Sequence, residues 1–256
     1  MKLGNYDVQK KIGEGGFGAI YQAEHVLLGE KACIKQNKEA SPVDARILIA
    51  EAKLLWRLDC YHSVPTVKEV FEVEKNNLAM AMTFIEGKTI DDIVKGHSRL
   101  HAEDVCWITE RLLGALRFCH YYGVIHGDVK PANVFVEPKK HDIKLIDFGL
   151  AVYMPTSTTA PIGYTPAFAA PEITQGKPPI PQTDIYGAGM VMLHALGGDL
   201  MKRTFPSDVP EPLVEFCNSL IKYDPMQRPS WEKDDPLEKL SELRLKVFGR
   251  KHMSTK

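Results

Sequence analysis

The pattern of apolar residues changes its period near Glu86-Gly87, and this change limits the folds open to the chain. Before it, short runs alternate weakly between apolar and polar residues, as half-buried strands do. After it, apolar residues recur mainly at helical spacing. Because the two patterns are segregated along the chain, we expect an α+β protein in which a small β-rich lobe precedes a larger helical lobe.

The expected strands of the first part are Tyr6–Ile12, Ala19–His25, Lys31–Gln36, Val67–Val73 and Leu78–Phe84. One helix interrupts them, because Ser41-Pro42-Val43-Asp44 is a strong helix start followed by apolar residues at helical spacing. In the second part we expect helices at Ala102–Tyr122, Gln182–Leu196, Leu213–Tyr223 and Leu237–Phe248, and short strands at Val134–Glu137 and Ile143–Ile146.

Composition narrows the classes of partner. The chain has 256 residues, with 32 basic against 33 acidic side chains and no long basic run, so nothing argues for nucleic-acid binding. Its 5 cysteines are widely spaced and form no CxxC pair, which fits reduced thiols better than a disulfide framework or a zinc site. The longest apolar run, near Gly189–Leu196, is too short to cross a bilayer, and the first residues lack a signal-peptide pattern. We therefore expect a soluble cytoplasmic protein without a membrane partner; the oligomeric state stays open.

The first motif with chemical content is the glycine cluster Gly13-Glu14-Gly15-Gly16-Phe17-Gly18. A GxGxxG pattern alone fits a dinucleotide-binding turn, a nucleotide flap or an ordinary turn. The dinucleotide-binding turn requires a helix directly after the glycines. Here a strand-like run begins at Ala19, which favours a strand–loop–strand flap whose backbone N–H groups approach phosphates closely.

A lysine and a glutamate form the second candidate. Lys35 ends the strand-like run Ala32-Cys33-Ile34-Lys35, and Glu51 lies on the side of the following helix that also carries Leu55. A glutamate on that inward side needs a cationic partner, because an unpaired buried charge is costly. We expect Glu51 to hold Lys35 near the phosphates.

The third and strongest motif is His126-Gly127-Asp128-Val129-Lys130-Pro131-Ala132-Asn133, followed by Asp147-Phe148-Gly149. A carboxylate that takes a hydroxyl proton, an ammonium that neutralises phosphate and an amide oxygen for a metal ion suit phosphoryl transfer. Asp147 supplies a second oxygen ligand of the kind that Mg²⁺ binds.

Together, in this order and spacing, the motifs resemble those of eukaryotic-type serine/threonine protein kinases from about Tyr6 to about Trp231. The resemblance implies a bilobal protein-kinase-like fold with a small antiparallel β-sheet lobe at residues 1–86 and a mainly α-helical lobe at residues 87–256. The two lobes would form a single kinase domain over residues 1–256. The segment around residues 197–212 is shorter than is usual in that family, so a helix that often docks protein substrates is expected to be reduced or missing.

The resemblance also implies ATP and Mg²⁺ as cofactors, proteins as substrates, and a role for each matching residue. Asp128 matches the catalytic base, Lys130 the phosphate-neutralising lysine, and Lys35 with Glu51 the pair that holds the α- and β-phosphates. Asn133 and Asp147 match the metal ligands. Ile12 and Ile20 would cover the adenine, Ala32 would touch its other edge, Met82 matches the gatekeeper, and Thr83-Phe84-Ile85 matches the hinge. The full set expected to bind the nucleotide is Ile12, Gly13, Glu14, Gly15, Gly16, Phe17, Gly18, Ala19, Ile20, Ala32, Lys35, Met82, Thr83, Ile85, Asn133 and Asp147.

Beyond the catalytic motifs, Tyr164–Glu172 resembles the end of an activation segment, and Glu172 is expected to pair with Arg228. Asp184 resembles the start of the helix that braces the catalytic loop. Gly127 departs from the family, which usually carries arginine there to hold a phosphorylated activation segment. The resemblance therefore implies less dependence on that phosphorylation.

Two other functions stay open at this point. Small-molecule phosphotransferases of the aminoglycoside or choline type share the His-Gly-Asp pattern, but they lack the Ala-Pro-Glu segment end with its arginine partner. A pseudokinase scaffold would typically lack the lysine, the base or the metal aspartate, and none is missing here. Lys130 and Thr165 resemble the serine/threonine class rather than the tyrosine class.

Overall fold

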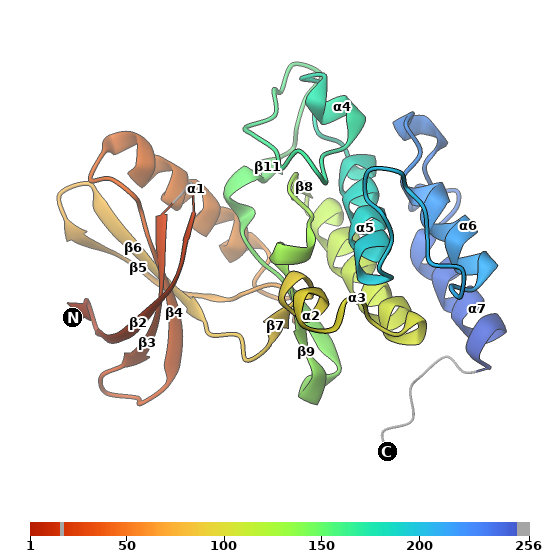
Figure 1. Cartoon of the computed structure of the whole chain (residues 1–256). Helices are drawn as coiled ribbons and strands as arrows, with labels where there is room; N and C mark the ends of the chain where they lie inside the picture. The colour runs from red at the N-terminus through yellow and green to blue at the C-terminus, as the bar shows by residue number, and fades with distance from the viewer. Residues whose placement is uncertain (16–17, 250–256) are drawn as a thin grey trace. The chain divides into compact units, whose positions relative to one another are not determined.

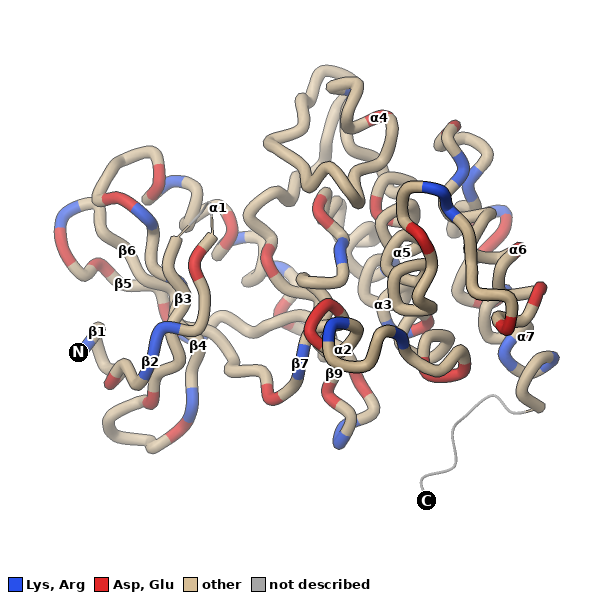
Figure 2. The backbone as a smooth tube through the Cα atoms, viewed as in Figure 1, with Lys and Arg blue, Asp and Glu red and all other residues tan. Residues whose placement is uncertain are grey.

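The computed structural model describes residues 1–15 and 18–249 (Figure 1). These residues form two compact units, which are treated separately below. The first comprises Met1–Glu86 together with Asp147–Gly149, and the second comprises Gly87–Ile146 and the chain from Leu150 onward. The first unit is built on a sheet and the second mainly on helices, so the α+β class is confirmed. Basic and acidic residues are interspersed along the described chain (Figure 2).

The first unit contains a six-stranded antiparallel sheet in the order β1-β2-β3-β4-β6-β5. One face of this sheet carries a buried apolar cluster that includes Tyr6, Ala23 and Ile34. The strand β2 runs on to Gly15, beyond the predicted end at Ile12, because the glycine cluster pairs with the start of β3. The strands are β1 Lys2–Leu3, β2 Tyr6–Gly15, β3 Gly18–His25, β4 Lys31–Gln36, β5 Val67–Glu74 and β6 Asn77–Thr83.

Helix α1 (Pro42–Arg57) packs against β5 and β6. Its start follows from the sequence: the Ser41 hydroxyl accepts a hydrogen bond of 3.1 Å from the Asp44 N–H, and Pro42 occupies the first turn, where its missing N–H costs nothing. Leu48, Glu51 and Leu55 are buried on the packed side of the helix. The helix therefore presents a carboxylate inward along with its apolar stripe.

Two long helices form the centre of the second unit. α3 buries Leu112, Leu113 and Leu116, and it packs against α5, which is buried on nearly all sides. A helix that is apolar all round belongs in the interior of a domain. The helices of this unit are α2 Ile90–His97, α3 Ala102–Tyr121, α4 Pro171–Thr174, α5 Pro181–Ala195, α6 Glu211–Leu220 and α7 Pro236–Phe248.

Short strands hold the loops of the second unit in place. β9 (Val134–Glu137) pairs with β10 (Asp142–Leu145) and with β7 (Lys88–Thr89), while β8 (Val124–Ile125) pairs with β11 (Val152–Tyr153). The segment from His126 to Asn133 is thus suspended between β8 and β9. The three two-residue strands were not predicted, because two residues are too few to show a period.

The connection from α5 to α6 is built of turns, with an isolated bridge between Asp199 and Thr204. Arg203 secures it, because its guanidinium donates to the Ile221 carbonyl at 3.0 Å and to the Tyr186 hydroxyl at 2.5 Å. This connection is therefore tied to the helical core.

Gly187 marks the close approach of α5 to Val129, in the segment His126–Asn133. A Cβ at Gly187 would lie 2.7 Å from the Val129 Cβ and 2.8 Å from the Val129 carbonyl oxygen. We expect Gly187→Ala to destabilise the fold by about 1–3 kcal/mol through overpacking, as measured by urea unfolding. Gly96→Ala is the matched control: it lies in α2 with open space around it, and we expect it to stabilise the protein by up to about 1 kcal/mol. Equal stability of Gly187→Ala and the wild type would contradict this packing.

Candidate active site

In the first unit, Lys35 lies between two carboxylates. Its Nζ is 2.8 Å and 2.7 Å from the two Glu51 oxygens and 2.9 Å from Asp147 Oδ1. Lys35 and Glu51 are only 5% and 3% exposed. The pairing expected between β4 and α1 is present, and Asp147 joins it from a distant part of the chain.

The opposite charges in this cluster offset the effect of burial on the pKa of each group. Burial alone would lower the pKa of Lys35, but the carboxylates of Glu51 and Asp147 outweigh it and raise that pKa. Burial raises the pKa of Glu51, against the opposing effect of Lys35. Lys35 is therefore a positioned, permanently charged ammonium at neutral pH.

The register of the sheet shows which residues share the face of Lys35. Lys35 lies opposite Ile20 on β3 and Met80 on β6, while Cys33 lies opposite Met82. Side chains of directly opposed residues point to the same face, and alternate residues of a strand do so too. Ile20, Cys33, Lys35, Met80 and Met82 thus share one face of the sheet.

Ala32 lies on the other face, within the apolar cluster, and this corrects the role expected of it. The residue that shares the Lys35 face is Cys33, two positions before the lysine. Strand alternation could have shown this, because only an even spacing keeps two residues on one face. Burial raises the pKa of the Cys33 thiol to about 11, so the group stays protonated at neutral pH.

The described glycines of the cluster lie at the ends of two paired strands. Gly13 pairs with Ile20, Glu14 with Ala19 and Gly15 with Gly18, and a strand rather than a helix follows the glycines. The dinucleotide-binding alternative is therefore wrong. Gly18 has φ +146° and leaves no room for a side chain, since a Cβ would lie 2.0 Å from the Gln36 carbonyl oxygen.

The remaining residues expected around the nucleotide are placed as follows. Gly16 and Phe17 lie outside the described residues. Ile12 is 45% exposed, and Glu14 forms an ion pair with Lys11. Thr83 ends β6, and its N–H is already bound to the Thr66 carbonyl at 2.9 Å. Ile85 follows outside any regular element and is half-buried.

In the second unit, three side chains form a closed polar triangle. Lys130 Nζ donates to Asp128 Oδ2 at 2.5 Å and to Thr165 Oγ1 at 2.8 Å, and the Thr165 hydroxyl donates to Asp128 Oδ1 at 2.7 Å. Asp128 and Thr165 line a crevice of about 10 Å³, together with Phe168 and Gly187. That volume suits a group about the size of one water molecule or hydroxyl.

Asn133 completes the loop. Its amide nitrogen donates to the Asp128 carbonyl at 3.0 Å, so the side chain is fixed with its nitrogen toward Asp128. The amide is buried, and its oxygen is a hard ligand of the kind that suits Mg²⁺.

Asp147, in the first unit, offers the same ligand chemistry. It adopts φ +63°, a backbone conformation that is uncommon for residues other than glycine and that is concentrated at functional sites. Each of the two residues thus offers an oxygen ligand of the kind that Mg²⁺ binds.

Asp184, at the start of α5, binds the backbone of the loop His126–Asn133. Its carboxylate accepts the backbone N–H groups of His126 and Gly127, each at 2.8 Å. Gly127 has φ +76°, so glycine suits this position better than residues with a side chain. One buried carboxylate thus fixes the backbone of the loop that carries Asp128.

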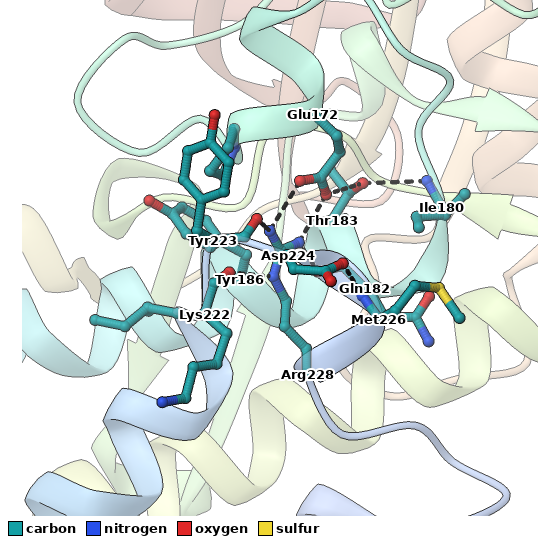
Figure 3. A network of polar contacts seen from close by, with 12 residues as sticks. Glu172, Ile180, Gln182, Thr183, Tyr186, Lys222, Tyr223, Asp224, Met226 and Arg228 are labelled. Carbon is teal, nitrogen blue, oxygen red and sulfur yellow. Dashed lines mark hydrogen bonds and ion pairs between the residues drawn. The ribbon is translucent and has the colours of Figure 1, made fainter.

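A second buried network joins α4 to the loop before α7 (Figure 3). The Arg228 guanidinium donates to both Glu172 oxygens at 2.7 Å and 2.8 Å, and its other N–H groups donate to the carbonyls of Gln182, Tyr223 and Lys222. All five of its donors are therefore used. The Tyr186 ring lies 4.8 Å from the Arg228 guanidinium carbon and 5.4 Å from that of Arg203.

Comparison with known proteins settles the family. The profile of the protein kinase domain matches residues 6–234, most of the chain. The chain belongs to the protein kinase family. This kinase domain is 29% identical over 206 residues to the serine/threonine-protein kinase pkn3 of Myxococcus xanthus, covering 75% of this chain and 38% of that protein.

A second relative is the SNF1-related protein kinase catalytic subunit alpha KIN12 of Arabidopsis thaliana. It is 26% identical to this kinase domain over 201 residues, which cover 77% of this chain and 40% of that protein. The chain thus spans about two fifths of the length of these relatives.

The Glu172–Arg228 pair provides a test of the second unit. Arg228→Met would leave the Glu172 carboxylate buried without its cation, so we expect a loss of about 3–5 kcal/mol in the free energy of unfolding. Adding Glu172→Gln should restore part of that loss, because the uncompensated charge is then removed. The control is Arg99→Met, which breaks an exposed pair with Asp208 and should cost no more than about 1 kcal/mol. Additive losses in the double variant would argue against direct coupling.

Proposed function

We propose that this kinase domain is a serine/threonine protein kinase that transfers the γ-phosphoryl group of ATP to serine or threonine hydroxyls of protein substrates. The observation that carries the proposal is the triangle of Asp128, Lys130 and Thr165. It combines a buried carboxylate, a cation and a threonine hydroxyl, and the carboxylate and the hydroxyl line a crevice of hydroxyl size. Membership of the protein kinase family supports the same activity.

The nucleotide-binding role falls to the first unit. Lys35, held by Glu51, is proposed to bind the α- and β-phosphates, and the glycine hairpin to cover them. Ile20, Met82 and Cys33 share the Lys35 face of the sheet and are proposed to contact the base, with Cys33 in the place first expected of Ala32. The hinge role of Thr83 and Ile85 stays a prediction.

Asp128 is the proposed base. The acceptor hydroxyl oxygen forms a bond to the γ-phosphorus, the bond from that phosphorus to the leaving diphosphate oxygen breaks, and the hydroxyl proton passes to the Asp128 carboxylate. The Thr165 hydroxyl donates to Asp128 Oδ1, which supports the proposal that this carboxylate orients an acceptor hydroxyl. Lys130 stabilises the charge on the transferring group.

Asn133 and Asp147 are the proposed ligands of Mg²⁺. When bound, the ion neutralises phosphate charge and orients the phosphates. Lys35 holds Asp147 by one carboxylate oxygen, so the same ammonium would link the phosphates to the metal ligand.

Two features favour this function over the alternatives. Glu172 and Arg228 form the pair that small-molecule phosphotransferases lack. A pseudokinase scaffold would be expected to lack one of Lys35, Asp128 and Asp147, and the chain has all three. Neither alternative gains support from a specific observation.

The wider context of the chain rests on the sequence. We propose that residues 1–256 form a single kinase domain with lobes at residues 1–86 and 87–256, and that the region around residues 197–212 is shortened. Among the described helices, none is long and apolar enough to cross a membrane. A cytoplasmic location and the lack of a nucleic-acid partner stay predictions.

Removing the proposed base is the direct test of activity. We expect Asp128→Asn to lower kcat for phosphate transfer from labelled ATP to a generic protein acceptor by about 10²–10⁴-fold, because the amide cannot take the proton. The exposed Asp59→Asn change is the matched control and should leave kcat unchanged. Transfer to a small hydroxyl compound but not to protein would favour the small-molecule alternative. Undiminished transfer in Asp128→Asn would refute the assignment.

A further prediction concerns regulation of this activity. We propose that the domain is active without phosphorylation of its activation segment, because Gly127 offers no cation to a phosphate there. The Thr156 N–H and hydroxyl instead contact the Thr159 hydroxyl. Protein expressed in bacteria and treated with phosphatase should keep its kcat, as measured with the same acceptor. Turnover that appears only after phosphorylation by another kinase would contradict the proposal.

A further inference from the structure

The indole of Trp231 reaches a buried histidine behind the catalytic loop. Its Nε1 donates to His120 Nδ1 at 2.9 Å, and the other ring nitrogen, His120 Nε2, lies 2.8 Å from Asp184 Oδ2. All three residues belong to the second unit. The His120 side chain is 3% exposed and that of Asp184 1%, so water competes little with these contacts.

The direction of the first hydrogen bond sets the proton position on His120. An indole N–H only donates, so the Nδ1 that receives it must carry no proton. The neutral ring then carries its proton on Nε2, which donates to the Asp184 carboxylate. Both neighbours thus require the same tautomer, and the indole of Trp231 fixes the His120 ring from the side opposite Asp184.

Asp184 connects the His120 ring to the backbone that precedes Asp128. Oδ2 accepts both the His120 ring N–H and the backbone N–H of His126, while Oδ1 accepts the N–H of Gly127. These two amides directly precede Asp128. A carboxylate turned by its histidine partner would therefore shift the backbone from which Asp128 projects.

We infer that Trp231 is a positioning residue for Asp128 that acts through His120 and Asp184, an inference that rests on the proposed kinase function. The indole N–H donates to His120 rather than to Asp128, Lys130 or Thr165. Its effect passes to His120 and Asp184, and from Asp184 through two hydrogen bonds to the amides of His126 and Gly127. Trp231 therefore influences the orientation of the base without taking part in nucleotide binding.

Two changes at Trp231 test the kinetic consequence. Trp231→Phe removes the indole, and replacement of Trp231 by 3-benzothienylalanine keeps the bicyclic shape but lacks the N–H. We expect both to lower kcat about fivefold, the scale of one lost hydrogen bond, with KM for ATP unchanged. Trp107→Phe is the control, because it removes an indole N–H that donates to Asp104 on the outer part of α3. An unchanged kcat in the benzothienyl variant would overturn the inference.

Nuclear magnetic resonance provides a readout that does not depend on catalysis. The ¹⁵N shifts of the His120 ring should report a protonated Nε2 in the wild type, and the Nδ1 signal should shift in both Trp231 variants, because Nδ1 loses its hydrogen-bond donor. The amide signals of His126 and Gly127 should shift in the same variants and stay in place in Trp107→Phe. A wild-type His120 protonated on Nδ1, or loop amides that do not respond, would refute the positioning role.

The two arms separate the possible failures. If the wild type transfers no phosphate, the proposed function fails, and the loop amides still decide whether Trp231 positions the loop. If the wild type is active and the Trp231 variants match it in kcat and in the His126 and Gly127 amide signals, the positioning role alone is refuted.

Discussion

One buried carboxylate supports the chemistry of the second unit. The segment from β8 to β9 makes few ladder hydrogen bonds of its own, yet buried backbone N–H groups need acceptors. Asp184, which is 1% exposed, supplies an acceptor to two consecutive amides of that segment. This carboxylate therefore holds the backbone directly before Asp128, whose side chain belongs to the polar triangle.

Buried ion pairs fix the positions of other polar groups in the same way. Lys35 and Glu51 join a strand to a helix, and Glu172 and Arg228 join α4 to the loop before α7. Such pairs add little net stability, because desolvation offsets most of the attraction between the charges. Each pair instead holds a polar group in one orientation within an apolar interior. In Lys35 that orientation leaves an ammonium on the sheet face opposite the apolar cluster.

Arginine has a similar role in the connection between α5 and α6. Arg203 and Arg228 both contact the Tyr186 ring, and Arg203 also binds the Tyr186 hydroxyl. A planar guanidinium donates several hydrogen bonds and packs on an aromatic ring at the same time. Arg203 therefore anchors this connection, which contains no helix, to the helical core.

Features encoded by neighbouring residues were readable from the sequence: the β4 strand at Lys31–Gln36, the Ser41 cap, the inward side of α1 and the order of the motifs. Each depends on residues a few positions apart, where period and hydrogen-bonding chemistry act directly. Other features depend on contacts between distant positions. Strand alternation places Cys33 on the Lys35 face, but the opposition of Cys33 to Met82 depends on the register of two strands, and the bond from Trp231 to His120 spans 111 positions. Folding brings such pairs together, because burial and strand register act on the whole domain, and no local pattern of residues records them.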